Sequence, residues 1–296
     1  GLSKQRCFKL PLWDGEESLK GKRILIWSEQ GVGDTINWCS LLSWVASQVD
    51  DCILECQEKL VPLLVRSFPD IVVKPEFRGL DKGRNDFDFH IPMGSLYRHF
   101  LKKTFQEVEP AAFLIPDPVR VKFWEERLRS LGTGSYVGIS WKSSDMSPER
   151  LQNYAPISEW APLFKVADVT FINLQYKNFS DDLIKIQNEF GVMVHNFDDL
   201  DHFNNLDDVA ALCAALDVVV SIKNTIPLIS AGVGTLTKLA NWRQSPWNNN
   251  LLNPLGPSVE IFQRNTWEPW ENIFSLIAEE VKKHSCSLRI NEGNYS

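Results

Sequence analysis

The residues with the clearest chemical potential form a short glycine-rich turn that contains a carboxylate. Gly31, Gly33 and Asp34 directly follow an apolar run, residues 23–27, which predicts a buried strand. A helix is expected next, because apolar side chains recur there at helical spacing. Two glycines allow a tight turn at the carboxyl end of a strand, where open α/β sheets bind ligands. The alternative is a plain strand-to-helix turn in which Asp34 or Thr35 caps the helix.

A second candidate site follows the most apolar strand expected in the chain, residues 217–222. Its residues run from the strand into a helix: Ser221, Lys223, Asn224 and Thr225. Asn224 or Thr225 can cap the helix, and Pro227 suits its first turn, where a missing N–H costs nothing. The open amides and a nearby lysine favour a phosphate ligand. An ordinary capped helix is the alternative.

Composition excludes several functional classes. The chain has 296 residues, 44% of them hydrophobic, which is enough for two domains with buried cores. A net charge of −7 argues against nucleic acid as a partner. We expect no membrane span, since no apolar run approaches ~20 residues. The six scattered cysteines lack zinc spacing, and the chain does not start like a signal peptide. We therefore expect a cytoplasmic protein with reduced thiols. Gly1 in place of Met suggests a piece of something longer.

Strand and helix signals alternate through both halves of the chain. We expect strands at 23–28, 52–56, 71–74, 87–91, 136–141, 169–174, 191–195, 217–222, 235–240 and 258–262. Helices are expected at 35–48, 58–66, 119–128, 181–190, 207–216, 225–231 and 268–283, with a turn at 92–95. Strands too apolar to face solvent imply parallel sheets covered by helices.

Prolines near the middle of the chain mark the expected domain junction. We predict an N-terminal, acceptor-side Rossmann-like domain over residues 1–116. A C-terminal, nucleotide-sugar-side Rossmann-like domain should span 117–284, and 285–296 should form a tail. The junction should separate two parallel sheets, and the final helix is expected to cross back to the first domain.

The order of several motifs resembles one known group. They are Leu10 to Glu16, Lys20 to Trp27, Glu29 to Thr35, Phe87 to His90, Val137 to Trp141, Phe171 to Gln175, Ala210 to Ser221 and Pro257 to Gln263. Together they resemble, over roughly residues 8–282, the glycosyltransferase-like domain often found after tetratricopeptide repeats in bacterial proteins. That group is related to the heptosyltransferases of glycosyltransferase family 9. The resemblance implies an α/β, GT-B-like fold of two Rossmann-like domains whose parallel sheets face a central cleft.

The resemblance also implies a reaction, inverting glycosyl transfer from a nucleotide-sugar donor to an unknown glycan, lipid-linked or protein acceptor. By position, Asp34 would be the general base at a glycine turn that lets the backbone approach the sugar. The helix start at Asn224 and Thr225 would hold the diphosphate, and Gln175 would lie near the nucleotide. The scheme requires no metal or other cofactor. An N-terminal repeat region outside this chain would be a further partner.

Four positions depart from the family's pattern: Lys223, Leu228, Ser143 and Asn153 stand where an Asp, a His, a Gly and a basic residue are usual. Lys142 or Arg150 could supply the missing positive charge. These departures leave open a second function, a catalytically silent GT-B-fold binding module with a degenerate donor site. Stabilisation by a nucleoside diphosphate would distinguish the two.

Overall fold

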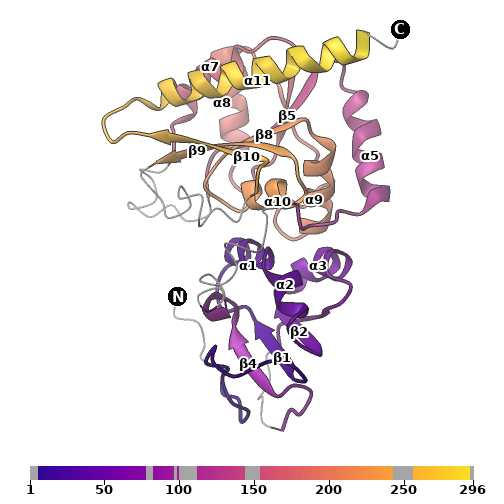
Figure 1. The fold of residues 1–296 in the computed structure, drawn as a ribbon. Helices are drawn as coiled ribbons and strands as arrows, with labels where there is room; N and C mark the ends of the chain where they lie inside the picture. Colours follow the sequence, from indigo (N-terminus) through magenta and orange to yellow (C-terminus); the bar gives the residue numbers. More distant parts are fainter. Residues whose placement is uncertain are drawn as a thin grey trace. The chain divides into compact units, whose positions relative to one another are not determined.

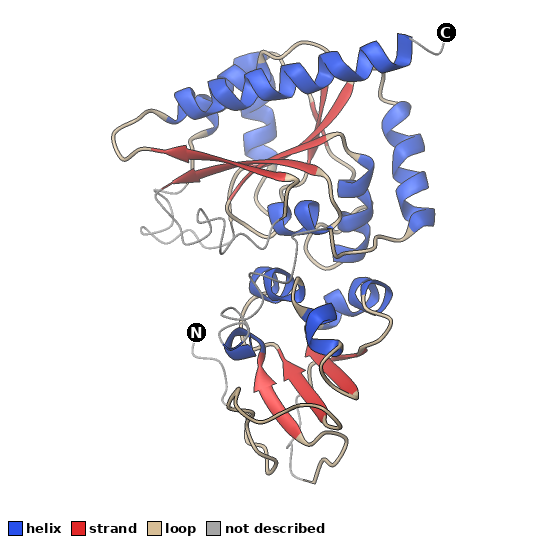
Figure 2. Cartoon of the chain, viewed as in Figure 1, coloured by secondary structure: helices blue, strands red, loops and turns tan. Residues whose placement is uncertain are grey.

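The computed structural model describes residues 6–77, 83–96, 99, 112–143, 154–242 and 256–293. The chain divides into two compact units. The first is Gly1–Ile115 with Pro254–Gly256, and the second is Pro116–Asn253 with Pro257–Ser296. Each unit is built on one parallel sheet, as Figure 2 shows by its red strands. The predicted α/β class and pair of parallel sheets are therefore confirmed.

The first unit has a four-stranded sheet of order β3-β2-β1-β4. The strands are β1 Arg23–Trp27, β2 Asp51–Cys56, β3 Val72–Pro75 and β4 Phe89–Pro92. The helical segments are α1 Val32–Cys39, α2 Leu42–Ala46, η1 Glu58–Leu60 and α3 Val61–Ser67. Because every pairing is parallel, β1 and β2 end at the same edge of the sheet. The glycine-rich turn follows β1 at that edge.

Residues near the N-terminus pack against one hydrophobic core cluster of the first unit. Phe8 and Leu10 pack against Trp27 and its buried neighbours Leu25, Ile53 and Phe87. Glu55, on β2, is also buried, and its two carboxylate oxygens bind Arg6 at 2.7 Å and Arg84 at 2.6 Å. Pairing with two guanidinium groups compensates a charge that would otherwise be costly to bury.

The second unit has a six-stranded sheet of order β10-β9-β8-β5-β6-β7. Its strands are β5 Ser135–Ser140, β6 Val169–Asn173, β7 Val194–His195, β8 Val218–Ile222, β9 Leu236–Trp242 and β10 Val259–Arg264. The chain adds strands outward from β5 to β7, then returns to add β8 on the other side of β5. The order therefore reverses between β5 and β8, the kind of place where doubly wound sheets bind ligands.

Helices cover both faces of this second sheet (Figure 1). They are α5 Pro118–Arg129, η2 Ile157–Trp160, α7 Ala161–Phe164, α8 Ser180–Phe190, α9 Leu206–Ala215, α10 Ile226–Gly232 and α11 Trp270–Gly293. One layer is formed by α5, α9 and α10, and the other by α7, α8 and α11. In the second layer Trp160 lies 4.2 Å from Phe274, between ring centroids. No helix in the part of the chain that the structure describes has the length and apolarity to cross a bilayer.

Several expectations for the first unit are wrong in detail. The helix expected over 35–48 is interrupted after Cys39, where the Ser40 hydroxyl donates to the Asn37 carbonyl and competes with the helical ladder. Residues 93–96 are helical where a turn was expected. The carboxylate that satisfies the first amides of this segment comes from Glu29, distant in the sequence.

The second unit also differs from expectation in its helices. The spacing of Val119, Phe123, Trp124 and Leu128 predicts an inward face for the helix at 119–128. On α5, Trp124 and Leu128 are buried, but Val119 is 74% and Phe123 37% exposed, because α5 packs on α9 through a narrow stripe. The short helical segments η2 and α7 were not expected. Helix α11 continues to Gly293, into the expected tail, and belongs to the second unit, where it packs against α7 and β10.

Candidate functional site

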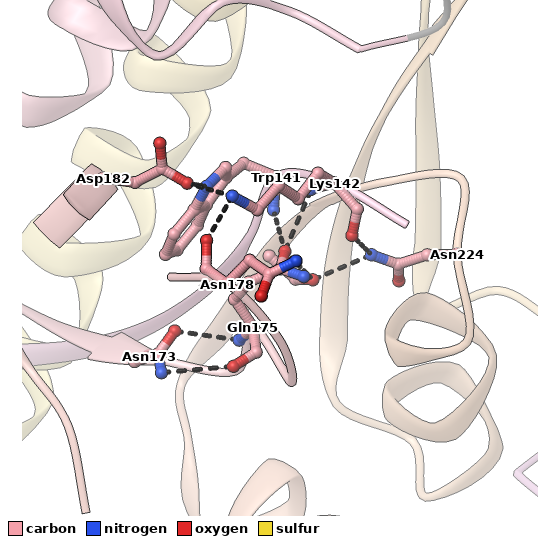
Figure 3. Close-up of polar contacts among 8 residues, drawn as sticks. Trp141, Lys142, Asn173, Gln175, Asn178, Asp182 and Asn224 are labelled. Atoms are coloured by element: carbon pink, nitrogen blue, oxygen red, sulfur yellow. Dashed lines mark hydrogen bonds and ion pairs between the residues drawn. The ribbon is translucent and has the colours of Figure 1, made fainter. Parts of the chain in front are cut away.

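The loops that follow β5 and β8 are joined by side chains at the point where the strand order reverses. Asn224 donates from its amide to the Ser140 hydroxyl at 2.8 Å and to the Lys142 carbonyl at 3.3 Å. The Ser221 hydroxyl donates to the Ser140 carbonyl at 3.2 Å. Figure 3 shows the bonds from Asn224. We call the group Ser140, Lys142, Gln175, Ser221 and Asn224 the polar edge.

Gln175 connects the next strand to the same edge. Its side-chain oxygen accepts from the backbone amides of Trp141 at 3.1 Å and Lys142 at 2.9 Å, and from the Ser140 hydroxyl at 3.3 Å. The residue is only 1% exposed. Asn173 in turn holds Gln175, since the Asn173 side-chain oxygen accepts from the backbone amide of Gln175 at 2.9 Å (Figure 3). Gln175 is thus placed to fix the loop after β5, with its oxygen already used within the protein.

Lys142 already has an anionic partner. Its ammonium group forms an ion pair with the Asp182 carboxylate and also donates to the Asn178 carbonyl. Asp182 further accepts from the Trp141 indole at 2.8 Å. The positive charge expected to meet a phosphate is therefore compensated within the chain, and a phosphate would have to compete with Asp182 for it.

The loop after β8 is shaped by Asn224. The Asn224 side-chain oxygen accepts from the Ile226 amide at 2.9 Å, whereas Thr225, at the N-cap position, makes no side-chain cap. Helix α10 has seven residues, so its macrodipole is small. Lys223 is half-buried just beyond β8, and Leu228 is buried in α10. Arg150 and Asn153 lie outside the described residues.

The glycine turn of the first unit differs from the predicted cap. Gly31 is the N-cap of α1, and its φ of −71° is open to any residue. Neither Gly31 nor Gly33 has a positive φ, so this turn does not depend on glycine's left-handed freedom. No side chain caps α1; the Thr35 hydroxyl instead donates to the Gly31 carbonyl at 3.2 Å. Asp34 lies in the first turn of α1 with its side chain exposed.

Glu29 is a residue of this turn that motif reasoning missed. Its carboxylate accepts from the amides of Met93 at 3.0 Å and Gly94 at 3.1 Å, which ties the turn to the end of β4. Burial raises the pKa of Glu29, and the nearby negative charge of Asp34 adds to the rise. Gly94 is required by the close approach, because a β-carbon there would come within 2.8 Å of Glu29 and 2.9 Å of Trp38. Glu29 stands in the matched motif, but nothing local in the sequence points to Met93 and Gly94.

Two buried polar atoms near the same turn have no hydrogen-bond partner among the described residues. They are the hydroxyl of Ser28, which follows β1, and the side-chain oxygen of Gln57, which follows β2. The Gln57 amide donates to the Gln30 carbonyl at 2.8 Å, so this side chain reaches across the edge of the sheet. Buried polar atoms are normally paired, so these two have hydrogen-bonding capacity that the described residues do not use.

Within the described ranges, no three His, Cys, Asp or Glu side chains are grouped as a metal site would need. All six cysteines are unpaired. Sequence analysis singled out neither Glu29 nor the Ser28 and Gln57 pair. It did predict Lys142, Gln175, Ser221 and Asn224, which the structure brings together at one edge.

The chain has a relative of similar sequence among known proteins. Protein FlbA of Caulobacter vibrioides is 30% identical over 306 aligned residues, covering 97% of this chain and 51% of FlbA. The chain thus spans about half the length of this curated relative. No family model matches this chain.

The structure is similar over most of its length to known glycosyltransferase structures. The glycosyl transferase family 9 structure from Veillonella parvula has a TM-score of 0.60 and 13% identity, with 91% of this chain and 98% of that chain covered. The E. coli ADP-heptose lps heptosyltransferase II has a TM-score of 0.58 and 13% identity, with coverage of 92% and 99%. The chain has a GT-B-like fold. At such low identity the likeness concerns the fold alone.

Proposed function

We propose that this chain is a glycosyltransferase that takes its sugar from a nucleotide-sugar donor. The observation that carries the proposal is the polar edge at the strand reversal of the second unit, within a fold shared with glycosyltransferases. Parallel α/β sheets bind nucleotides at such a reversal. One of the similar structures is named for ADP-heptose, which makes an adenine nucleotide the first donor to test.

The donor would bind to the second unit. Asn224, Ser221 and Gln175 hold the loops after β5 and β8 in place, and the helix start at Asn224 and Thr225 would receive the diphosphate. Lys142 and Lys223 would supply positive charge as the leaving nucleotide becomes more negative. For Lys142 this requires exchanging the Asp182 carboxylate for a phosphate oxygen, which binding of a dianion favours.

The acceptor would bind to the first unit, where Asp34 is the proposed general base. In an inverting transfer, the acceptor oxygen attacks the anomeric carbon while the bond from that carbon to the diphosphate breaks. The hydroxyl proton passes to Asp34, and the nucleoside diphosphate leaves with the bonding electrons. Gly31 and Gly33, beside Asp34, add no side chain to hinder the sugar. The unpaired atoms of Ser28 and Gln57 suit a ligand rich in hydroxyl groups.

Turnover of nucleotide-sugars tests the proposal. The wild type should release nucleoside diphosphate from one member of a panel of donors, and the product should have inverted anomeric configuration by NMR. Asp34→Asn should lower the rate by about 10²- to 10⁴-fold while the fold is kept, since an amide cannot accept the proton. Chelation of metals should leave the rate unchanged, because the scheme draws its positive charge from the chain. Absence of turnover with every donor, together with no nucleotide binding, would support the silent binding module instead.

A further inference from the structure

An aromatic pair lies on the surface of the second unit. Tyr176 and Phe203 stack with ring centroids 5.9 Å apart and ring planes 30° apart. The Lys177 ammonium lies 3.9 Å from the centroid of the Phe203 ring. Phe203 remains 38% exposed, although a phenyl ring gains free energy by leaving water. A partly exposed aromatic pair with a cation beside it offers a stacking surface to a planar ligand.

The pair stands next to the polar edge. Tyr176 immediately follows Gln175 beyond the end of β6, and Phe203 lies in the segment that follows β7. Both loops therefore leave the sheet at its carboxyl edge, where β5 and β8 also end. A ligand with its phosphates at the strand reversal would extend along this edge from β5 past Gln175 to Tyr176.

The two loops that carry the rings are fixed by hydrogen bonds within the unit. Asn173 bonds both: its side chain binds the Gln175 amide, and its carbonyl lies 3.0 Å from the ring Nε2 of buried His202. Asp201 accepts from the Phe203 amide at 2.9 Å. The rings are thus held in position before any ligand binds, which lowers the entropy lost on binding.

We propose that Tyr176 and Phe203 form the stacking surface for the base of the donor nucleotide. The inference rests on the proposed function, because the donor brings the base to this edge. Every nucleobase has a π face, and base–aromatic stacking contributes enough that losing one ring weakens binding by roughly 5- to 150-fold. Purines, with two fused rings, should gain more than pyrimidines.

Calorimetric titration with ADP, UDP and inorganic pyrophosphate tests this surface. Phe203→Leu should weaken ADP binding by at least about fivefold and leave pyrophosphate binding unchanged, because pyrophosphate has no base to stack. On binding, the adenine protons of ADP should shift upfield in NMR spectra of the wild type through the ring current, and less so with the variant. Phe123→Leu is the matched control: Phe123 is 37% exposed, in the same unit, on α5. It should leave all three affinities unchanged.

Three outcomes distinguish the claims. Selective loss of nucleotide affinity in Phe203→Leu supports the stacking surface. Wild-type affinity for ADP in that variant overturns the stacking surface and leaves the proposed function standing. Failure of the wild type to bind both pyrophosphate and every nucleotide overturns the two together. Equal melting temperatures of Phe203→Leu and Phe123→Leu would show that a change in binding does not come from unfolding.

Discussion

Asn173 is the residue whose removal should most clearly disturb the second unit's edge. It is fully buried. Its side-chain oxygen accepts from the backbone amide of Gln175 at 2.9 Å, and its side-chain nitrogen donates to the Asn196 side chain at 2.8 Å. Asn173→Ala leaves the Gln175 amide buried without a partner, which costs about 1–3 kcal/mol. Half-exposed Asn196 can bond to water instead, so losing the bond between Asn173 and Asn196 adds less. We expect the variant to lose about 2–3 kcal/mol of unfolding free energy in total.

The assay is thermal unfolding followed by calorimetry. For a unit of this size, a loss of about 2–3 kcal/mol lowers the melting temperature by roughly 4–12 °C. Asn196→Ala is the matched control, since it removes the bond to Asn173 and an exposed bond to Asp198 but leaves the Gln175 backbone amide paired, and it should cost less than about 1 kcal/mol. If Asn173→Ala melts within a degree or two of wild type, the network does not hold the edge, and our reasoning about Gln175 and the aromatic pair is refuted.

Three further predictions concern packing and charge. Glu55→Gln should destabilise the first unit by about 1–3 kcal/mol in urea unfolding, because mostly buried Arg6 and Arg84 lose the charge of Glu55 while Arg84 keeps its pair with Asp86; a change below about 1 kcal/mol would contradict this. Gly138→Ala should cost about 1–3 kcal/mol, since a β-carbon would come within 2.6 Å of both Leu174 and Leu216, and an unchanged urea midpoint would refute that clash. Burial lowers the pKa of His202, so the unfolded chain takes up its proton first and stability falls as pH drops below the ordinary value of 6.5. His202→Gln should flatten this fall between about pH 7 and pH 5, measured by urea midpoints; an equally steep fall would show that other groups cause it.

The fold could be predicted from sequence because its signals are local. Apolar strands such as Val218–Ile222 have no polar face, which indicates a parallel sheet buried on both sides. Element ends were less predictable, since they depend on contacts between distant residues. The break after Cys39 involves a side-chain bond from Ser40, and the helix at 93–96 is capped by Glu29 from another strand end.

The residues of the candidate site could be predicted from sequence, but their hydrogen-bond and ion-pair partners could not. Strand ends and the resemblance identified Lys142, Gln175 and Asn224, because parallel strands end at one edge. That Lys142 pairs with Asp182 could not be foreseen, since the partner comes from α8, forty residues away in the chain. Phe203 was missed for the same reason, because its ring stacks on Tyr176, which is distant from it in the sequence.

The most direct test of the central claim is whether a nucleoside diphosphate stabilises the wild-type chain. At a concentration about 100 times Kd, binding to the native state alone adds about 2.7 kcal/mol. The melting temperature of the second unit should then rise by roughly 5–10 °C with ADP or another nucleoside diphosphate, and by less with the matching nucleoside. A melting temperature that stays constant with adenosine, uridine and guanosine diphosphates at millimolar concentration would contradict a donor site in this chain.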